Sequence, residues 1–191
     1  MSSYLLPTYK RQPISFVKGQ GSYLYTADGT PYLDALTGIA VCGLGHCHPR
    51  ITAAIADQAA TLVHTSNLFG IDWQERAGEK LCQVAGMDKV FFANSGAEAN
   101  EAALKLARRW ALDKFGSEKQ QIISFGKSFH GRTFFTVTVG GQAAYSDGFG
   151  PKPGGIDHAE YNNLDSLKAL MSDNTCAVIL EPLQGEGGII P

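Results

Sequence analysis

The chain has 191 residues, of which 44% are hydrophobic, with 16 lysines and arginines against 18 aspartates and glutamates. This mixture is typical of one globular domain, or one and a fraction, and argues against a disordered chain. The net charge of −2 disfavours binding to nucleic acid or to an acidic membrane surface. No apolar run approaches the ~18 residues of a membrane span, and the N-terminal segment lacks the layout of a secretory signal. We therefore expect neither a membrane nor a nucleic-acid partner.

The cysteines and glycines indicate the redox compartment and the number of tight turns. The four cysteines are scattered, which fits unpaired thiols in a reducing compartment such as the cytoplasm. Cys82 and Cys176 lie in apolar segments and are expected to be packed core thiols. The 22 glycines exceed the usual share of about 7% and occur in clusters between apolar segments. They predict many tight turns, and backbone that can come close to a ligand.

Turn residues divide the chain into alternating strands and helices. Asp28-Gly29 predicts a hairpin turn, and Pro49 predicts the first turn of a helix. The next helix is expected to begin at Asp72, with Glu75 as its capping partner, and to end at Gly86. In that helix, one apolar face is formed by Trp73, Ala77, Leu81 and Val84. In chain order, we predict strands at 22–26 and 32–35, helices at 49–63 and 72–85, a strand at 89–93, a helix at 97–115, strands at 120–125 and 133–139, a helix at 164–171 and a strand at 176–180.

The alternation of strands and helices predicts an α/β fold with a mainly parallel sheet. Ligands of such sheets bind outside the carboxyl ends of the strands. Three segments follow predicted strands and therefore occupy that location: residues 94–97, 126–132 and 181–188.

The first of these segments, Asn94-Ser95-Gly96-Ala97, joins a strand to a long helix. The free amides of the first helical turn and the helix dipole create an anion site, for which phosphate is the usual ligand. The alternative is that Ser95 only caps the helix and Gly96 only eases the turn. Local features leave both interpretations open.

The other two segments carry rings and charges. Phe129-His130-Gly131-Arg132 offers a ring that can stack on a cofactor and a guanidinium fork that matches a carboxylate, unless it is a core phenylalanine with a surface arginine. Glu181 and Glu186 lie in a glycine-rich loop, where they either pair with a ligand cation or with Arg132, or are simply solvated.

Two other motifs are rejected on spacing. Gly126-Lys127-Ser128 resembles part of a P-loop, but position 121 is glutamine and position 122 is isoleucine, so the first glycine of the P-loop pattern is missing. His46-Cys47-His48, with Cys42 upstream, lacks the paired spacing of structural zinc sites, and we predict no metal site.

Four motifs in order resemble the class III pyridoxal-phosphate aminotransferases: YLDALTGIAVCGLGHCHP, NSGAEANEAALKLAR, SFHGRT and EPLQGEGG. The similarity runs from Tyr9 to Pro191 and is greatest to the acetylornithine aminotransferases, whose relatives act on succinylornithine or ornithine. It implies the aspartate aminotransferase-like fold type I and pyridoxal 5′-phosphate as the cofactor. Residues 1–48 would form an N-terminal arm and small-domain hairpin, and residues 49–191 the first part of the large domain.

The resemblance also assigns roles to residues of this chain. Arg132 would bind the substrate α-carboxylate, and Glu186 would help to discriminate amino donors from 2-oxoglutarate. Cys42 stands where the family usually has asparagine, so the entrance of the site is expected to differ slightly. The cofactor-binding residues would be Ser95, Gly96 and Ala97 at the phosphate, with Phe129 stacked on the pyridine ring and His130 beside it.

The implied reaction transfers an amino group from N2-acetylornithine to 2-oxoglutarate, giving N-acetylglutamate 5-semialdehyde and glutamate, as a step of arginine biosynthesis in a cytoplasmic homodimer. Family members are about twice as long, so the Schiff-base lysine is expected beyond Pro191, and the chain alone is expected to be inactive. Lys127 is a poor substitute, because the family uses a later lysine. The non-enzyme alternatives are a phosphate-binding half-domain and a self-associating one.

Overall fold

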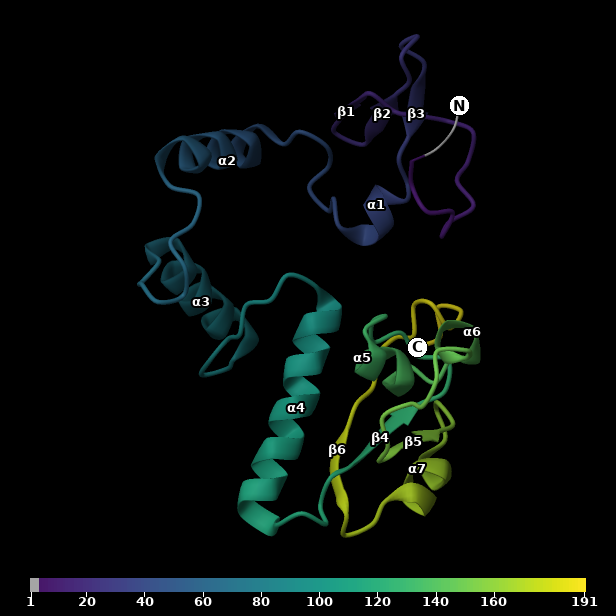
Figure 1. Cartoon of the computed structure of the whole chain (residues 1–191). Coiled ribbons are helices and arrows are strands. Elements are labelled where there is room, and N and C mark those ends of the chain that lie inside the picture. Colours follow the sequence, from purple (N-terminus) through teal and green to yellow (C-terminus); the bar gives the residue numbers. More distant parts are fainter. Residues whose placement is uncertain (1–3) are drawn as a thin grey trace. The chain divides into compact units, whose positions relative to one another are not determined.

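The computed structural model describes residues 4–191, which divide into two compact units. The first unit ends at Ala77 and the second runs from Gly78 to Pro191 (Figure 1). Every described residue that is buried belongs to the second unit. The expected domain boundary after residue 48 stays a prediction.

The first unit begins with a small antiparallel sheet in the order β1-β2-β3, formed by β1 (Lys18–Gln20), β2 (Tyr23–Tyr25) and β3 (Pro31–Leu33). The predicted hairpin is confirmed as β2 and β3. Its turn contains Gly29 at a φ of 84°, a conformation that glycine adopts without strain. Strand β1, which pairs with β2, was not predicted.

Two helices follow in this unit, the short α1 (Thr37–Ala40) and α2 (Pro49–Thr61). Helix α2 confirms the helix predicted to begin at Pro49. Before it, His46 Nε2 lies 2.6 Å from a carboxylate oxygen of Asp34, and this hydrogen bond is the main cause that lowers the pKa of Asp34. His46 thus has a structural partner, and the described residues contain no cluster of potential metal ligands.

Helix α3 (Asp72–Ala85) confirms the second predicted helix, and Asp72 lies in its first turn. Its helical hydrogen bonds begin one residue earlier, at the carbonyl of Ile71. The apolar face of α3 is largely exposed: 58% of Trp73 and 76% of Val84 remain accessible. Helical spacing therefore located an apolar stripe, but this chain does not bury it.

The second unit is built on a parallel sheet in the order β5-β4-β6, which confirms the predicted sheet type. Its elements include α4 (Gly96–Phe115), β4 (Gln121–Phe125), β5 (Ile156–Ala159) and β6 (Thr175–Val178). Successive residues of the central strand β4 face opposite sides of the sheet. Ile122 packs with Leu104 of α4 on one side, and Ile123 packs near Leu167 on the other.

Two predicted strands are wrong. Residues 89–93 are irregular, and no strand among the described residues pairs with them. This segment lies against α3 instead, where a Cβ added at Gly78 would stand 3.3 Å from Val90. An apolar run becomes a strand only when a neighbouring strand accepts its backbone hydrogen bonds.

The second wrong strand is residues 133–139, which form helix α5 (Phe134–Val139). β-branched residues favour strands, but this preference is weak enough for tertiary packing to override it. Thr136 and Val139 are fully buried in the helix, and the Thr138 hydroxyl donates a 2.9 Å hydrogen bond to the Phe134 carbonyl. The helix thus satisfies its threonines locally while burying its apolar side.

The remaining elements are α6 (Ala143–Ser146) and α7 (Leu164–Leu170), in addition to the strands above. Helix α7 and strand β6 confirm their predictions, whereas α1, α6 and β5 were not predicted. Strand β6 is half-buried rather than buried. Cys82 and Cys176 are both half-buried; Cys176 packs against the core, and burial raises the pKa of its thiol. Within residues 4–191, no helix is long and apolar enough to cross a membrane.

Candidate active site

The N-terminus of α4 lies in the segment 94–97, where a long helix was predicted to begin. Ser95 is the N-cap, and its Oγ accepts a 3.2 Å hydrogen bond from the Glu98 amide. The Glu98 carboxylate in turn accepts a 2.6 Å hydrogen bond from the amide of Asn94, the residue before the N-cap, so that Ser95 and Glu98 both fasten this turn. The amides of Gly96 and Ala97 belong to the first turn of a 20-residue helix, where no preceding helical carbonyl can accept them.

Space is open at this helix end. A Cβ built on Gly96 would meet no other atom within 4 Å. Partial positive charge from the helix dipole accumulates at the same place. These features suit a phosphate group, although the cap alone would also explain Ser95 and Gly96.

The loop that leaves β4 comes close to α4. The side-chain amide of Asn100 donates a 2.8 Å hydrogen bond to the His130 carbonyl. Gly131 has a φ of 128°, and a Cβ at this position would stand 2.6 Å from the Cβ of Ala97. Any other residue at position 131 would therefore clash with the helix end and would also strain the backbone.

The loop that leaves β6 joins the same place, because the carboxyl ends of β4 and β6 are neighbours in the sheet. The Phe129 amide donates a 3.0 Å hydrogen bond to the Glu181 carboxylate. Buried Gln184 donates a 3.0 Å hydrogen bond from its side chain to the Gly126 carbonyl. The three segments singled out in the sequence thus lie together at one edge of the sheet.

His130 is the buried titratable group of this edge. It is only 5% exposed, and its Nε2 has no hydrogen-bond partner among residues 4–191. Burial is the main cause that lowers its pKa; the nearby Glu181 charge acts in the opposite direction and His158 in the same one. A buried, neutral imidazole with an unused ring nitrogen is unusual in a folded protein and is typical of a binding site.

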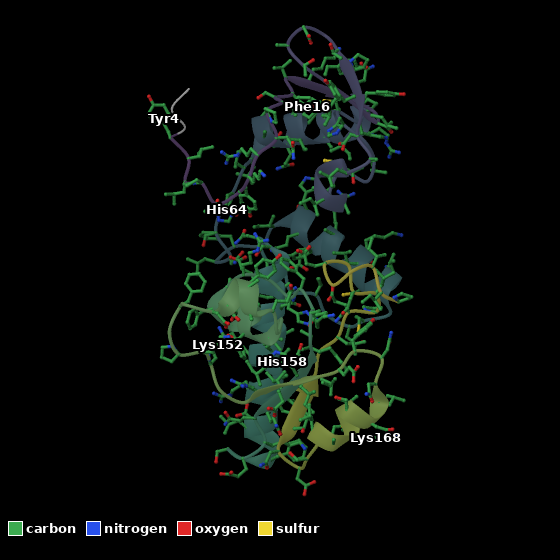
Figure 2. The ribbon with its side chains drawn as sticks, turned by 90° about the vertical axis from the view of Figure 1, so that its right-hand side faces the viewer. Tyr4, Phe16, His64, Lys152, His158 and Lys168 are labelled. Atoms are coloured by element: carbon green, nitrogen blue, oxygen red, sulfur yellow. The ribbon has the colours of Figure 1, made fainter. Side chains whose placement is uncertain are left out.

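His158, by contrast, has a structural role. It extends from β5 to α5, where its Nε2 lies 3.0 Å from the Thr138 carbonyl oxygen and 3.2 Å from that of Val139 (labelled in Figure 2). Because carbonyl oxygens only accept hydrogen bonds, this nitrogen must carry the proton.

The charged groups of the site are arranged around aromatic rings. The Arg132 guanidinium carbon lies 5.6 Å from the ring centre of Phe129 and 5.0 Å from that of Tyr145. The Tyr145 hydroxyl donates a 2.7 Å hydrogen bond to the Glu186 carboxylate. Arg132 and Glu186 are therefore both neighbours of one tyrosine that sequence reasoning did not single out.

Sequence reasoning also missed Asn100 and Gln184, which fasten the two loops to their neighbours. Asn100 lies in the quoted helix motif and Gln184 in the quoted loop motif, so their positions were visible although their roles were not. Tyr145 had no such signal, because it stands in a four-residue helix without apolar periodicity.

The residues at this edge fit a phosphorylated aromatic ligand that also carries polar groups. Open space at the α4 N-terminus suits its phosphate, and Phe129 offers a ring for stacking. The orphaned Nε2 of His130 is a further polar atom for such a ligand.

Comparison with known protein families identifies the family to which this chain belongs. The family model described as Aminotransferase class-III matches residues 5–191. The chain belongs to the class III aminotransferases. The predicted family is thereby confirmed, and no other family of anion-binding α/β proteins is needed to explain the motifs.

The curated relatives of this class III chain include two with informative names. Acetylornithine aminotransferase of Vibrio vulnificus is 58% identical over 98% of this chain and 46% of its own length. Acetylornithine/succinyldiaminopimelate aminotransferase of Yersinia pestis is 54% identical over 97% and 46%, respectively. The chain thus spans about half the length of the curated relatives that it matches.

Solved structures of class III aminotransferases have the same fold. An ornithine aminotransferase of Toxoplasma gondii, described with partial occupancy of pyridoxal phosphate at its active site, matches with a TM-score of 0.92 at 34% identity, over 98% of this chain and 44% of its own. The N-acetylornithine aminotransferase of Stenotrophomonas maltophilia matches with 0.79 at 36% identity, over 95% and 44%. The expected fold type I is confirmed for the part that this chain spans.

Proposed function

We propose that this chain forms the phosphate-binding and carboxylate-binding part of the active site of an acetylornithine aminotransferase. The observation that carries the proposal is the meeting of three segments at one sheet edge: the capped N-terminus of α4, the loop at 126–132 and the loop at 181–188. The high identity to enzymes named for acetylornithine supports the choice of substrate.

The cofactor in this proposal is pyridoxal 5′-phosphate. The amides of Gly96 and Ala97, beside Ser95, would hold its phosphate, and Phe129 would stack on its ring with His130 beside it. When bound, the cofactor supplies the electron sink that stabilises negative charge on the substrate carbon. Neutral His130 suits this position, because a protonated imidazole would place an additional positive charge in a buried site.

The substrate's carboxylate binds Arg132, whose planar guanidinium can donate two parallel hydrogen bonds to it. Cation–π contacts with the Phe129 and Tyr145 rings hold the guanidinium at this place before the substrate arrives. Glu186 lies on the substrate side and repels the second carboxylate of 2-oxoglutarate more than it repels an acylated amine. This difference gives Glu186 its proposed part in telling the two substrates apart.

The rest of the proposal concerns the whole protein. Residues 1–48 belong to a small domain and residues 49–191 to the large one, and the lysine that carries the cofactor is expected beyond Pro191. We propose a cytoplasmic homodimer. Large apolar side chains exposed near the end of α2, such as Val63 and Leu68, support an interface there, and sedimentation of the full-length protein tests it: a monomer would contradict this part.

Succinylated or free ornithine is the second candidate substrate. One relative, from Pseudomonas aeruginosa, is named succinylornithine transaminase/acetylornithine aminotransferase and is 52% identical over 98% of this chain. Incubating the full-length protein with 2-oxoglutarate and each of the three amino donors tests both candidates. We expect glutamate to form fastest with N2-acetylornithine; no glutamate with any donor would contradict the proposed function.

Replacing the proposed carboxylate ligand gives a sharper test. Arg132→Ala removes a charge-assisted fork, and we expect substrate binding to weaken by about 2–4 kcal/mol, which raises KM by a factor of roughly 30 to 1000. Arg109→Ala is the matched control, because Arg109 is exposed on α4 and its ion pair in the described part of the chain is with Asp113, one turn away. An unchanged KM for both substrates in the Arg132 variant would eliminate the proposed role.

A further inference from the structure

Tyr145 connects the two residues to which the proposed function gives substrate contacts. Its hydroxyl donates to Glu186 over 2.7 Å, and its ring carries the Arg132 guanidinium 5.0 Å above its centre. The rings of Tyr145 and Phe129 also meet edge to face, with 6.3 Å between their centres. One side chain therefore contacts the proposed carboxylate ligand, the proposed selectivity residue and the proposed stacking ring.

The backbone of Tyr145 is anchored to the same loop. Gln142, at the start of α6, donates a 3.0 Å hydrogen bond from its side chain to the Ser128 carbonyl. The Tyr145 amide donates to the Gln142 carbonyl over 3.1 Å, and the Ser146 hydroxyl donates to that carbonyl as well. Tyr145 is thus held in place before any ligand binds, which is the condition for a residue that orients others.

The Glu186 carboxylate accepts its hydrogen bond from the Tyr145 hydroxyl, and the Arg132 guanidinium, a second kind of donor, lies over the ring of the same tyrosine. The Tyr145 hydroxyl is neutral, whereas the Arg132 guanidinium on the same ring is cationic and presents several N–H groups. A carboxylate that turned to Arg132 would occupy the group that must bind the substrate's carboxylate. The hydrogen bond to Glu186 is also the main cause that raises the pKa of Tyr145, whereas the hydrogen bond and the charge of Arg132 act in the opposite direction.

We propose that Tyr145 is a positioning residue: its hydroxyl holds the Glu186 carboxylate and thereby keeps it from competing with the substrate carboxylate for Arg132. The inference rests on the proposed function, because it takes Arg132 and Glu186 as substrate ligands. It predicts that the effect of the hydroxyl depends entirely on the charge at position 186.

The test uses the full-length protein loaded with pyridoxal 5′-phosphate, as wild type and with Tyr145→Phe, Glu186→Gln and both together. KM and kcat are measured for N2-acetylornithine and 2-oxoglutarate, and calorimetry measures the Kd of glutarate, an unreactive dicarboxylate. Tyr145→Phe should raise both KM values and the glutarate Kd about tenfold, the size of one hydrogen bond to a charged group. The value of kcat should stay within about twofold, because the change affects ground state and transition state alike.

In the Glu186→Gln background, the same Tyr145→Phe change should leave KM and Kd unaltered, because no carboxylate then competes for Arg132. Tyr161→Phe is the matched control: its hydroxyl also donates a hydrogen bond, of 2.8 Å, but to the Glu181 backbone carbonyl. It should leave KM unchanged. Equal KM values for wild type and Tyr145→Phe, an equal rise in both backgrounds or the same rise in Tyr161→Phe would each overturn the inference.

The two proposals can fail separately. If the wild-type protein does not transaminate N2-acetylornithine, the proposed function fails. The glutarate affinities then decide the role of Tyr145 alone: a loss that depends on Glu186 supports it, and equal affinities overturn it.

Discussion

The two units of this chain differ most clearly in what they bury. Among the described residues up to Ala77, none is buried, although the segment contains a sheet and two helices before α3 begins. From Gly78 onwards, a central strand is covered on both sides: Ile122 and Ile123 have no exposed surface at all. Hydrophobic burial is the main stabilising contribution in folded proteins, so the second unit can hold its shape by itself far better than the first.

This difference explains where the candidate site lies. Its three segments all belong to the second unit and are fastened by hydrogen bonds to the buried sheet. Exposed apolar residues occur in both units, for example Ile55 and Val63 in the first and Phe91 and Leu106 in the second, and such residues suit contact with further protein. The sheet edge of the candidate site thus belongs to the second unit, whereas exposed apolar side chains are found in both units.

The largest expected effect is at the core of the second unit. Ile123→Ala should lower the free energy of unfolding by about 2–5 kcal/mol, because it leaves a cavity in a fully buried strand. Ile55→Ala, the same substitution on α2 where Ile55 is 64% exposed, should change it by less than about 0.5 kcal/mol. Hydrogen exchange of the β4 amides measures the difference, and similar effects of both variants would contradict the comparison.

The next prediction is that the stability of the second unit depends on pH through His130. His130 has a lowered pKa in the folded chain, so it binds fewer protons than in the unfolded chain near pH 6. Stability should therefore fall as the pH drops below the ordinary histidine pKa of about 6.5, by at most about 1.4 kcal/mol per pH unit for one proton.

Melting curves between pH 8 and pH 5.5, without cofactor, measure this slope. His130→Gln and His130→Asn should both flatten it relative to wild type, because neither side chain takes up the proton. An identical slope in wild type and in both variants would show that His130 does not cause the pH dependence.

The smallest expected effect on stability comes from removing a helix N-cap, and two such variants distinguish capping from ligand binding. Ser95→Ala should cost about 1 kcal/mol as a lost N-cap, and so should Asn163→Ala, whose side chain accepts from the Ser166 amide at the start of α7. In the full-length protein, only Ser95→Ala should also weaken binding of pyridoxal 5′-phosphate. Equal cofactor affinity in both variants would leave Ser95 with its structural role only.

Much of the fold could be predicted because local rules and tertiary structure agreed. Pro49, Ser95 and Asn163 each stand where their chemistry starts a helix, and Gly116 ends α4 at a φ of 89°. The motifs that follow β4 and β6 then placed the candidate site at the sheet edge, since parallel strands end on the same side. The motif at 94–97 was assigned to this edge through a strand at 89–93 that the structure lacks.

The failures have physical reasons of two kinds. For residues 133–139, burial of Thr136 and Val139 in α5 outweighed their preference for strands. For residues 89–93, strand formation depends on a pairing partner that the described residues do not supply. Tyr145 could not be predicted because its importance arises from contacts with Arg132 and Glu186, which no spacing along the chain reveals.

The most direct test of the central claim is a crystal structure of the full-length protein with pyridoxal 5′-phosphate. The account predicts the phosphate within hydrogen-bonding distance of the Gly96 and Ala97 amides and the pyridine ring stacked on Phe129. A phosphate bound away from the α4 N-terminus, or a ring that does not touch Phe129, would contradict it.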